Sequence, residues 1–173
     1  MKALKTILTL TLILFIGITI TSAAPKQIEL TPKGEKSKIV YIGEDNGKTL
    51  YLLEKEIEKT LPQYIETANW TLSVVHQKSK PEKVTADENL TKYRNIEKEK
   101  VWAESISFTY NNKTKIVSLN NFTYYNEKGQ IIADLAENLK NIPQEERSFR
   151  LEDNKDLKDF FAKITTCLDS KLK

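Results

Sequence analysis

The chain has 173 residues, and its 27 lysines and arginines outnumber its 24 acidic residues, which leaves a formal charge of +3 at neutral pH. Its single cysteine and single histidine exclude a disulfide-stapled miniprotein and a Cys/His zinc module, and they leave little room for a Cys–His or Ser–His catalytic pair. The length predicts one domain, and 29% charged with 9% aromatic residues is typical of a folded one.

The N-terminal segment has the three parts of a secretory signal peptide. Lys2 and Lys5 make a short basic start, residues 7–20 (ILTLTLILFIGITI) form an uncharged apolar run, and residues 21–24 (TSAA) are small. This order is typical of exported proteins. The alternative is an uncleaved membrane anchor, because the apolar run extended to Ala24 approaches the ~18 residues that a spanning helix needs. Three threonines and a glycine within the run favour cleavage.

Cleavage is predicted after Ala23, because signal peptidases require small side chains one and three residues before the cut, here Ala23 and Thr21. Cleavage after Ala24 would place Pro25 directly past the bond, which is unfavourable. Residues 1–23 are therefore assigned to the signal peptide, and no stable membrane span is predicted after cleavage. Loss of its two lysines leaves 27 minus 2, or 25, basic residues against 24 acidic ones. Such a nearly neutral chain has no net electrostatic basis for binding nucleic acid.

The mature chain begins with a predicted flexible leader, residues 24–37, which is rich in proline, glycine and lysine. A short extended piece is expected within it at residues 28–30. Residues 38–173 form the predicted single domain. It opens with a hairpin, because the β-branched and aromatic runs 38–42 and 49–53 are separated by turn-forming residues.

A short helix, two strands and a long loop are expected next. Residues 54–60 favour a helical turn whose extension Pro62 limits. Alternating residues 70–76 predict a third strand, and residues 101–110 predict a fourth. Between them, residues 78–100 are polar and long, so they are predicted to form a loop that is either functional or a tolerated insertion.

The rest of the sheet and a closing helix follow. Residues 115–125 predict a fifth strand with a bulge at Asn120–Asn121, which returns two offset pairs of apolar side chains to one face. Residues 130–134 predict a sixth strand. Asp153 or Asn154 can cap a C-terminal helix, whose apolar residues recur at helical spacing. These apolar residues are Leu157, Phe160, Phe161, Ile164, Leu168 and Leu172.

Strands first and one helix last predict an α+β fold with about six antiparallel strands and the C-terminal amphipathic helix packed on one face of the sheet. A single helix covers only one face. Tyrosines on the uncovered face would form a binding surface or a dimer interface; the alternative is that they line the core and its rim. The tyrosines concerned are Tyr41, Tyr51, Tyr110, Tyr124 and Tyr125.

Short runs within residues 38–168 resemble the surface-adhesin protein E family of exported bacterial proteins. The runs that carry this resemblance are Tyr41–Gly43, Leu50–Leu52 with Ile57, Ile116–Leu119, Phe122–Ile131, Ile142-Pro143, and a final helix with Leu157, Phe161 and Cys167. The resemblance implies a protein that adheres to a host or envelope protein, and no cofactor is expected.

The resemblance also marks Cys167 as the C-terminal half of a family disulfide, whose other half would lie in a central strand near Tyr110–Asn111. This chain has no second cysteine, so the position is unpaired here. Because Cys167 follows Phe160 by seven residues, we expect it on the apolar face of the helix as a small buried hydrophobic residue. The alternative is a reactive thiol or an intermolecular disulfide.

No catalytic residue and no metal site are predicted. His76 is the only histidine; it ends a predicted strand with no carboxylate nearby, so we expect it at the edge of the sheet. Residues 44–47 (EDNG) carry oxygen donors but lack the spacing of a calcium-binding loop, and are expected to form a turn.

Together these features predict an exported, non-enzymatic interaction protein of the cell surface or the periplasm, with a protein as its partner. The alternative is an envelope structural or stress protein that acts as a homodimer. A third alternative, an enzyme that uses acidic residues alone, would require two carboxylates to converge in a cleft.

Overall fold

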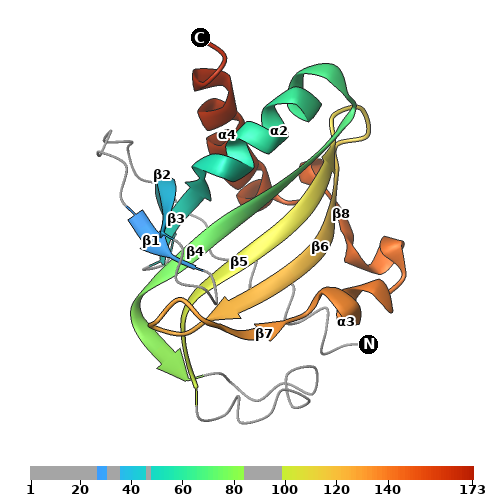
Figure 1. The fold of residues 1–173 in the computed structure, drawn as a ribbon. Helices are drawn as coiled ribbons and strands as arrows, with labels where there is room; N and C mark the ends of the chain where they lie inside the picture. The colour runs from blue at the N-terminus through green and yellow to red at the C-terminus, as the bar shows by residue number, and fades with distance from the viewer. Residues whose placement is uncertain (1–26, 31–35, 46–47, 84–98) are drawn as a thin grey trace.

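The described residues form one antiparallel sheet accompanied by helices, which confirms the predicted α+β class (Figure 1). The residues that the computed structural model describes are 27–30, 36–45, 48–83 and 99–173. The predicted signal peptide and its cleavage site at Ala23 and Ala24 lie outside these residues.

Over the residues that the structure describes, the sheet has eight strands rather than about six. The strands are β1 (Gln27–Glu29), β2 (Lys36–Asp45), β3 (Lys48–Leu53), β4 (Asn69–Lys83), β5 (Lys100–Asn111), β6 (Ile116–Tyr125), β7 (Ile131–Asp134) and β8 (Ser148–Arg150). The α-helices of the described residues are α2 (Glu54–Glu66), α3 (Ala136–Lys140) and α4 (Lys155–Ser170), and short 3-10 helices span Gln144–Arg147 and Leu151–Asp153. Strands β1 to β7 neighbour one another in chain order, and β8 also pairs with β6. Among the helices of the described residues, none has the length and apolarity that a membrane crossing requires.

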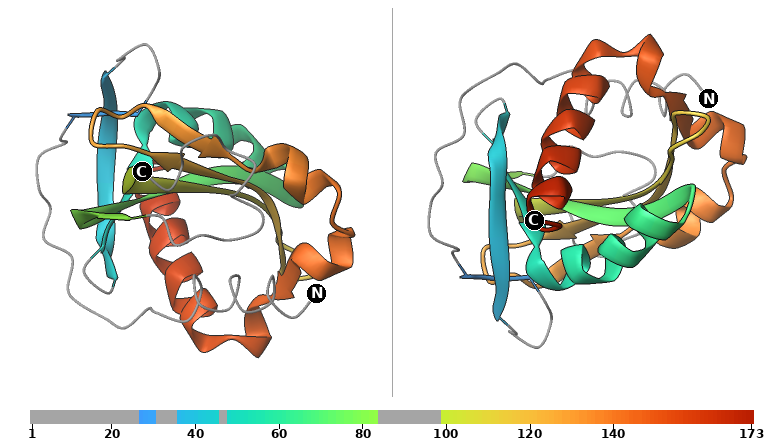
Figure 2. Two further views of the ribbon diagram at one scale, coloured as in Figure 1. Left: turned by 90° about the horizontal axis from the view of Figure 1, so that it is seen from below. Right: turned by 90° about the horizontal axis from the view of Figure 1, so that it is seen from above.

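Helix α4 runs within the curve of the sheet and fills its concave face (Figure 2). Asn154 caps the helix, and its Oδ1 accepts a hydrogen bond from the Leu157 amide at 3.0 Å. The ring of Phe161 lies 6.1 Å from that of Trp70 and 4.8 Å from that of Phe108. The helix residues buried here are Leu157, Phe160, Phe161, Ile164 and Leu168, whereas Leu172 lies beyond the helix and is 47% exposed. The predicted stripe is confirmed except at its last residue.

The predicted bulge in the fifth strand is present in β6. Ser107 of β5 pairs with Asn121, and the next β5 residue, Phe108, pairs with Leu119, so Asn120 is the extra residue. Because the bulge restores the alternation, Leu119 and Phe122 both reach the core beneath α4.

Helix α2 continues through Pro62, although the sequence predicted that this proline would limit it. Pro62 and Glu58 both lie on the exposed side of the helix. Water can therefore solvate the Glu58 carbonyl, which would otherwise accept the missing backbone hydrogen bond. On the other side, the Thr60 hydroxyl oxygen lies 2.7 Å from the Thr71 carbonyl oxygen, and the Gln63 side chain accepts a hydrogen bond from the Thr71 amide at 3.2 Å. These contacts hold α2 along the edge of β4.

Strand β1 lies against the convex face of the sheet, where it completes a second apolar cluster. Its three residues pair with β2 from Gln27–Lys38 to Glu29–Lys36. The cluster consists of Leu30, Ile39, Tyr51, Val75 and Ala103, with Ile28, Tyr41, Leu53, Trp102 and Tyr125 partly buried around it. The extended piece expected at residues 28–30 is present as β1, and its apolar side chains Ile28 and Leu30 complete a core. The prediction of a flexible leader is wrong for residues 36–37, which begin β2.

Strand β4 is longer than predicted, and its extension replaces the start of the predicted loop 78–100. The strand passes a second bulge between Gln77 and Glu82 and then pairs with β5 again, Glu82 with Val101 and Lys83 with Lys100. A run of polar residues is typical of a loop, but here the pairing of Glu82 and Lys83 with β5 keeps the end of the segment extended. Residues 84–98 of the predicted loop lie outside the described residues.

The turn between β6 and β7 touches the backbone of β1. The Asn126 Oδ1 accepts hydrogen bonds from the backbone amides of Lys128 and Gln130, each at 3.0 Å. Gly129 in this turn has a φ of +71°, and a Cβ added to it would lie 1.8 Å from the Glu29 carbonyl oxygen. Glycine is therefore required here both by the backbone conformation and by the approach of β1.

We expect Gly129→Ala to destabilise the fold by at least about 2 kcal/mol. The left-handed conformation alone costs an alanine about 1–2 kcal/mol, and the added Cβ must also displace the backbone of Glu29. Unfolding in denaturant measures the difference. The matched control is Lys128→Ala in the same turn, where an exposed side chain is removed and a change within about 0.5 kcal/mol is expected. Equal stabilities of the two variants would contradict the close approach.

Candidate functional site

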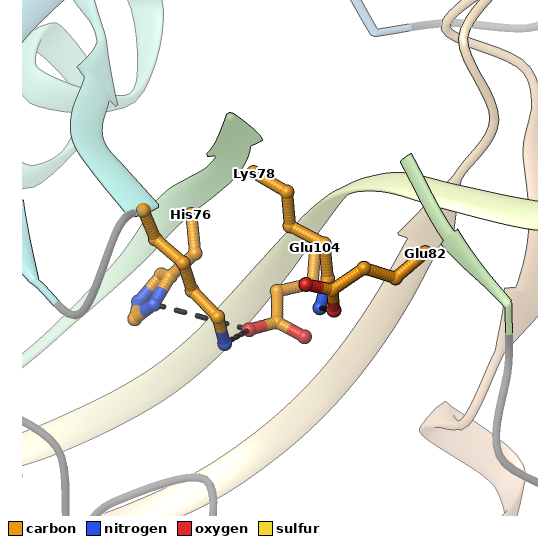
Figure 3. A network of polar contacts seen from close by, with 5 residues as sticks. His76, Lys78, Glu82 and Glu104 are labelled. Atoms are coloured by element: carbon orange, nitrogen blue, oxygen red, sulfur yellow. Dashed lines mark hydrogen bonds and ion pairs between the residues drawn. The ribbon is translucent and has the colours of Figure 1, made fainter. Parts of the chain in front are cut away.

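Three ionisable side chains meet on the concave face where β3, β4 and β5 lie next to one another. His76 pairs with Leu50 of β3 on one side and with Glu104 of β5 on the other. The Lys48 ammonium lies 2.6 Å from Glu104 Oε1, and His76 Nδ1 lies 4.0 Å from the same oxygen (Figure 3). His76 and Glu104 are buried, and Lys48 is 24% exposed along its side chain. We call these three residues the ionic cluster.

A second ion pair stands beside the ionic cluster. Lys78 and Glu82 are joined across the bulge of β4, and Figure 3 shows them next to Glu104. The positive charge of Lys78 also acts on the Glu104 carboxylate. The extended end of β4 thus supplies additional charge to the cluster.

The surroundings set the charge of each group in the cluster. Burial by itself would raise the pKa of the Glu104 carboxyl, but the nearby Lys48 and Lys78 ammonium groups and the hydrogen bond from Lys48 outweigh it, so this pKa is lowered. Burial lowers the pKa of His76 from 6.5 to about 4; Glu104 opposes this shift and Lys48 adds to it. At neutral pH the cluster therefore holds an ionised Glu104 and a neutral His76.

His76 does not lie at the edge of the sheet, and the expectation that it has no carboxylate nearby is wrong. Its ring packs 5.9 Å from the ring of Phe160 in α4. Glu104 is far from it in sequence, and only the pairing of β4 with β5 brings the two together. As far as the structure describes residues 27–173, no three His, Cys, Asp or Glu side chains form a group that could hold a metal ion. We interpret the ionic cluster as a structural tie between three strands.

The convex face of the same strands has a different chemistry. Over residues 69–73, 105–111 and 118–123, every outward-facing position holds Ser, Thr or Asn (Figure 1 shows this face from the front, with α4 behind the sheet). We call this surface the outer polar face. It consists of Asn69, Thr71, Ser73, Ser105, Ser107, Thr109, Asn111, Ser118, Asn120, Asn121 and Thr123, and Ser148 of β8 extends it. Ser118 and Thr123 are buried, and the other residues of this face are half-buried or exposed. None of these side chains carries a charge, although 29% of the chain is charged.

The residues of the outer polar face stand in rows and bind one another. Thr71, Thr109, Ser118 and Ser148 are neighbours across four strands. The hydroxyl oxygens of Thr71 and Thr109 lie 3.0 Å apart, and those of Ser118 and Ser148 lie 2.7 Å apart. Asn120, the extra residue of the bulge, donates from Nδ2 to the Thr109 hydroxyl at 2.9 Å. The sequence signal for this face is the alternation of Ser, Thr and Asn with apolar residues along the three strands.

The five tyrosines predicted to form a surface do not lie together. Tyr110 and Tyr124 belong to the concave side beneath α4, whereas Tyr41, Tyr51 and Tyr125 belong to the cluster under β1. Tyr51 and Tyr110 are buried, and their rings contact Tyr41 and Trp70 respectively. These two line the cores, and the prediction of one binding surface formed by the five tyrosines is wrong.

Cys167 lies half-buried against the core beneath α4. Burial raises the pKa of its thiol, and the positive charge of Lys171 opposes that shift only in part. A raised pKa lowers the fraction of thiolate, which is the reactive form. The position therefore agrees with a small residue of the apolar helix face.

We expect the stability of the protein to fall as the pH decreases from 7 to 5. The folded-state pKa of His76, about 4, is below its ordinary value of 6.5, so the unfolded chain binds a proton in this range and the folded chain does not. The stability that depends on neutral His76 is present above pH 6.5 and is lost towards pH 4, with a loss of about 2 kcal/mol between pH 7 and pH 5.

Denaturant unfolding at several pH values measures this loss. Because the chain has no other histidine, His76→Gln is expected to make the stability nearly constant between pH 7 and pH 5, even if the variant is less stable at pH 7. Parallel pH profiles of the two proteins would contradict a buried neutral histidine.

Removal of one partner of the Lys48–Glu104 pair should destabilise the fold more than removal of both. We expect Lys48→Met to cost about 2–3 kcal/mol, since it leaves a buried carboxylate without its cation, and Lys48→Met with Glu104→Leu to cost less. Lys38, which pairs with Glu54 at 3.5 Å on the exposed surface, provides the control, and Lys38→Met should change stability by less than about 0.5 kcal/mol. A double variant less stable than Lys48→Met would contradict this role.

The chain was compared with models of protein families, with curated proteins and with solved structures, and none of them matches it. Its function must therefore be inferred from its own residues and from the geometry of the two surfaces described above.

Proposed function

We propose that this chain is an exported bacterial protein that binds a partner at the cell surface or in the periplasm and is not an enzyme. The observation that carries this proposal is the order of the N-terminal segment. A basic start with Lys2 and Lys5, an apolar run over residues 7–20 and small residues 21–24 favour export followed by cleavage.

The described strands and helices all begin after the predicted cleavage site, which supports the export part of the proposal. Cleavage after Ala23 would leave only residues 24–26 ahead of β1, which begins at Gln27. Every described residue would remain in the mature protein. The signal peptide could then be removed without loss of any strand or helix of the described residues.

The outer polar face supports the binding part of the proposal. Among the described residues, the helices pack beneath or beside β4, β5 and β6, and their outer side holds short neutral groups (Figure 2). The resemblance to surface-adhesin protein E proteins also implies adhesion. In that interpretation the ionic cluster and the aromatic core stabilise the sheet, and the outer face meets the partner.

The second candidate is an envelope structural or stress protein that acts as a homodimer. One observation favours it: Ser, Thr and Asn side chains both donate and accept hydrogen bonds, so two copies of the outer polar face could pair without repulsion between like charges. Sedimentation over a range of concentrations distinguishes the candidates. A monomer at every concentration would contradict this second function.

We expect the full-length chain, produced in a bacterium with a C-terminal tag, to accumulate in the envelope or outside the cell with Ala24 as its first residue. Cell fractionation and mass spectrometry measure location and cleavage. Ala23→Leu places a large side chain directly before the cut, so the uncleaved precursor should accumulate. Ala24→Leu is the matched control and should be cleaved normally. Full-length protein confined to the cytoplasm would contradict export.

A further inference from the structure

The outer polar face is complementary to a particular kind of ligand. Its Ser and Thr hydroxyls and Asn amides each donate and accept hydrogen bonds without carrying charge. Nucleic acids and anionic membranes are bound through Lys and Arg, and the strongest positions in protein interfaces are mostly Trp, Tyr and Arg. None of these residue types belongs to the outer polar face, although Arg150, two residues beyond Ser148 in β8, lies at its border. A neutral polymer rich in hydroxyl groups offers matching donors and acceptors.

The face is also preorganised for such a ligand. Thr71 and Thr109 bind each other at 3.0 Å, Asn120 binds Thr109 at 2.9 Å, and Asn111 donates from Nδ2 to Asn69 Oδ1 at 2.7 Å. These contacts fix the side-chain rotamers before any ligand arrives, which reduces the entropy lost on binding. Each of these amides also retains a second N–H that can reach a ligand.

An aromatic ring borders one end of the face. Tyr125 is half-buried and shares the convex side with Thr123 of its own strand and with Ser105 of β5, which pairs with Thr123. The body of the ring packs on the cluster under β1. A ring fixed in this way can stack on the C–H face of a sugar while the neighbouring hydroxyls bind its O–H groups.

We propose that the outer polar face binds a neutral carbohydrate polymer, with the row around Thr71 and Thr109 at its centre and Tyr125 at its border. This inference deepens the proposed function by naming the chemical class of the partner. It rests on the proposed function only for the location of that partner, which would be the cell surface or the periplasm. The binding itself is a property of the folded chain.

The test uses the purified protein as the cell produces it from the full-length chain. Beads of dextran, mannan and cellulose serve as neutral polymers, and heparin beads serve as the anionic polymer. We expect retention on at least one neutral polymer at physiological salt and none on heparin. Thr71→Val with Thr109→Val should weaken retention about tenfold or more, since two hydrogen-bonding groups are lost together.

Stability should change by no more than about 1 kcal/mol in this double variant, because both partners of the Thr71–Thr109 hydrogen bond are replaced by side chains of the same shape, and the Asn120 amide, which loses its acceptor at Thr109, is partly exposed and can bind water instead. Thr165→Val is the matched control: its hydroxyl binds the Phe161 carbonyl within α4 at 3.1 Å, and its loss should leave retention unchanged. If the first variant fails to fold, Ser73→Ala with Ser107→Ala tests the neighbouring row and should also weaken retention.

Several results would overturn the inference. They are retention on none of the neutral polymers, equal retention of the wild type and the variants of the outer face, retention on heparin that salt suppresses, and a dimer that Thr71→Val with Thr109→Val converts to a monomer. The proposed function can fail separately, since a chain that stays in the cytoplasm could still bind the polymers. An exported chain that binds none of these polymers would agree with the proposed export and would contradict carbohydrate binding.

Discussion

The pairing of β4 with β5 is the constraint on which the rest of the structure depends. Trp70 pairs with Tyr110, and Thr71 pairs with Thr109. The alternation sends the first pair into the core beneath α4 and the second pair to the outer polar face. A slip of one residue would exchange the two faces, because the side-chain period of a strand is two. The aromatic core therefore fixes the register, and the register in turn assembles the outer face.

The same alternation distributes charge in an unusual way. Along the concave face, the aromatic series of β5 ends at Glu104, and the apolar series of β4 ends at His76. The ionised Glu104 is thus buried on the concave side of the sheet, while the outer polar face on the opposite side carries no charge. Burial of Glu104 is tolerable because Lys48 reaches over from β3 to neutralise it. The outer face needs no such compensation, since its groups carry no charge and several of them bind one another.

Local features were predictable from the sequence, and features that depend on distant partners were not. The bulge at Asn120–Asn121 follows from the offset of neighbouring apolar pairs, and the cap at Asn154 follows from its place before an apolar stripe. The extent of α2 was missed because the effect of Pro62 depends on which side of the helix meets water. The contact of His76 with Glu104 was missed because a strand pairing far apart in sequence creates it. The extended piece at β1 was predictable from Ile28 and Leu30, but its pairing with β2 and its packing on the second apolar cluster were not, because both depend on distant residues.

Helix α2 covers an edge of the sheet at which another copy of this protein could otherwise pair. Of the described strands, β3 pairs only with residues 74–78 of β4, so the first residues of β4 have one side without a neighbouring strand. Thr60 and Gln63 occupy that side by engaging the backbone of Thr71. Strand edges with unused backbone groups are the usual starting points of aggregation. By covering this edge, α2 prevents a second copy of the chain from pairing its strand edge to edge with the start of β4, even where many copies are crowded together.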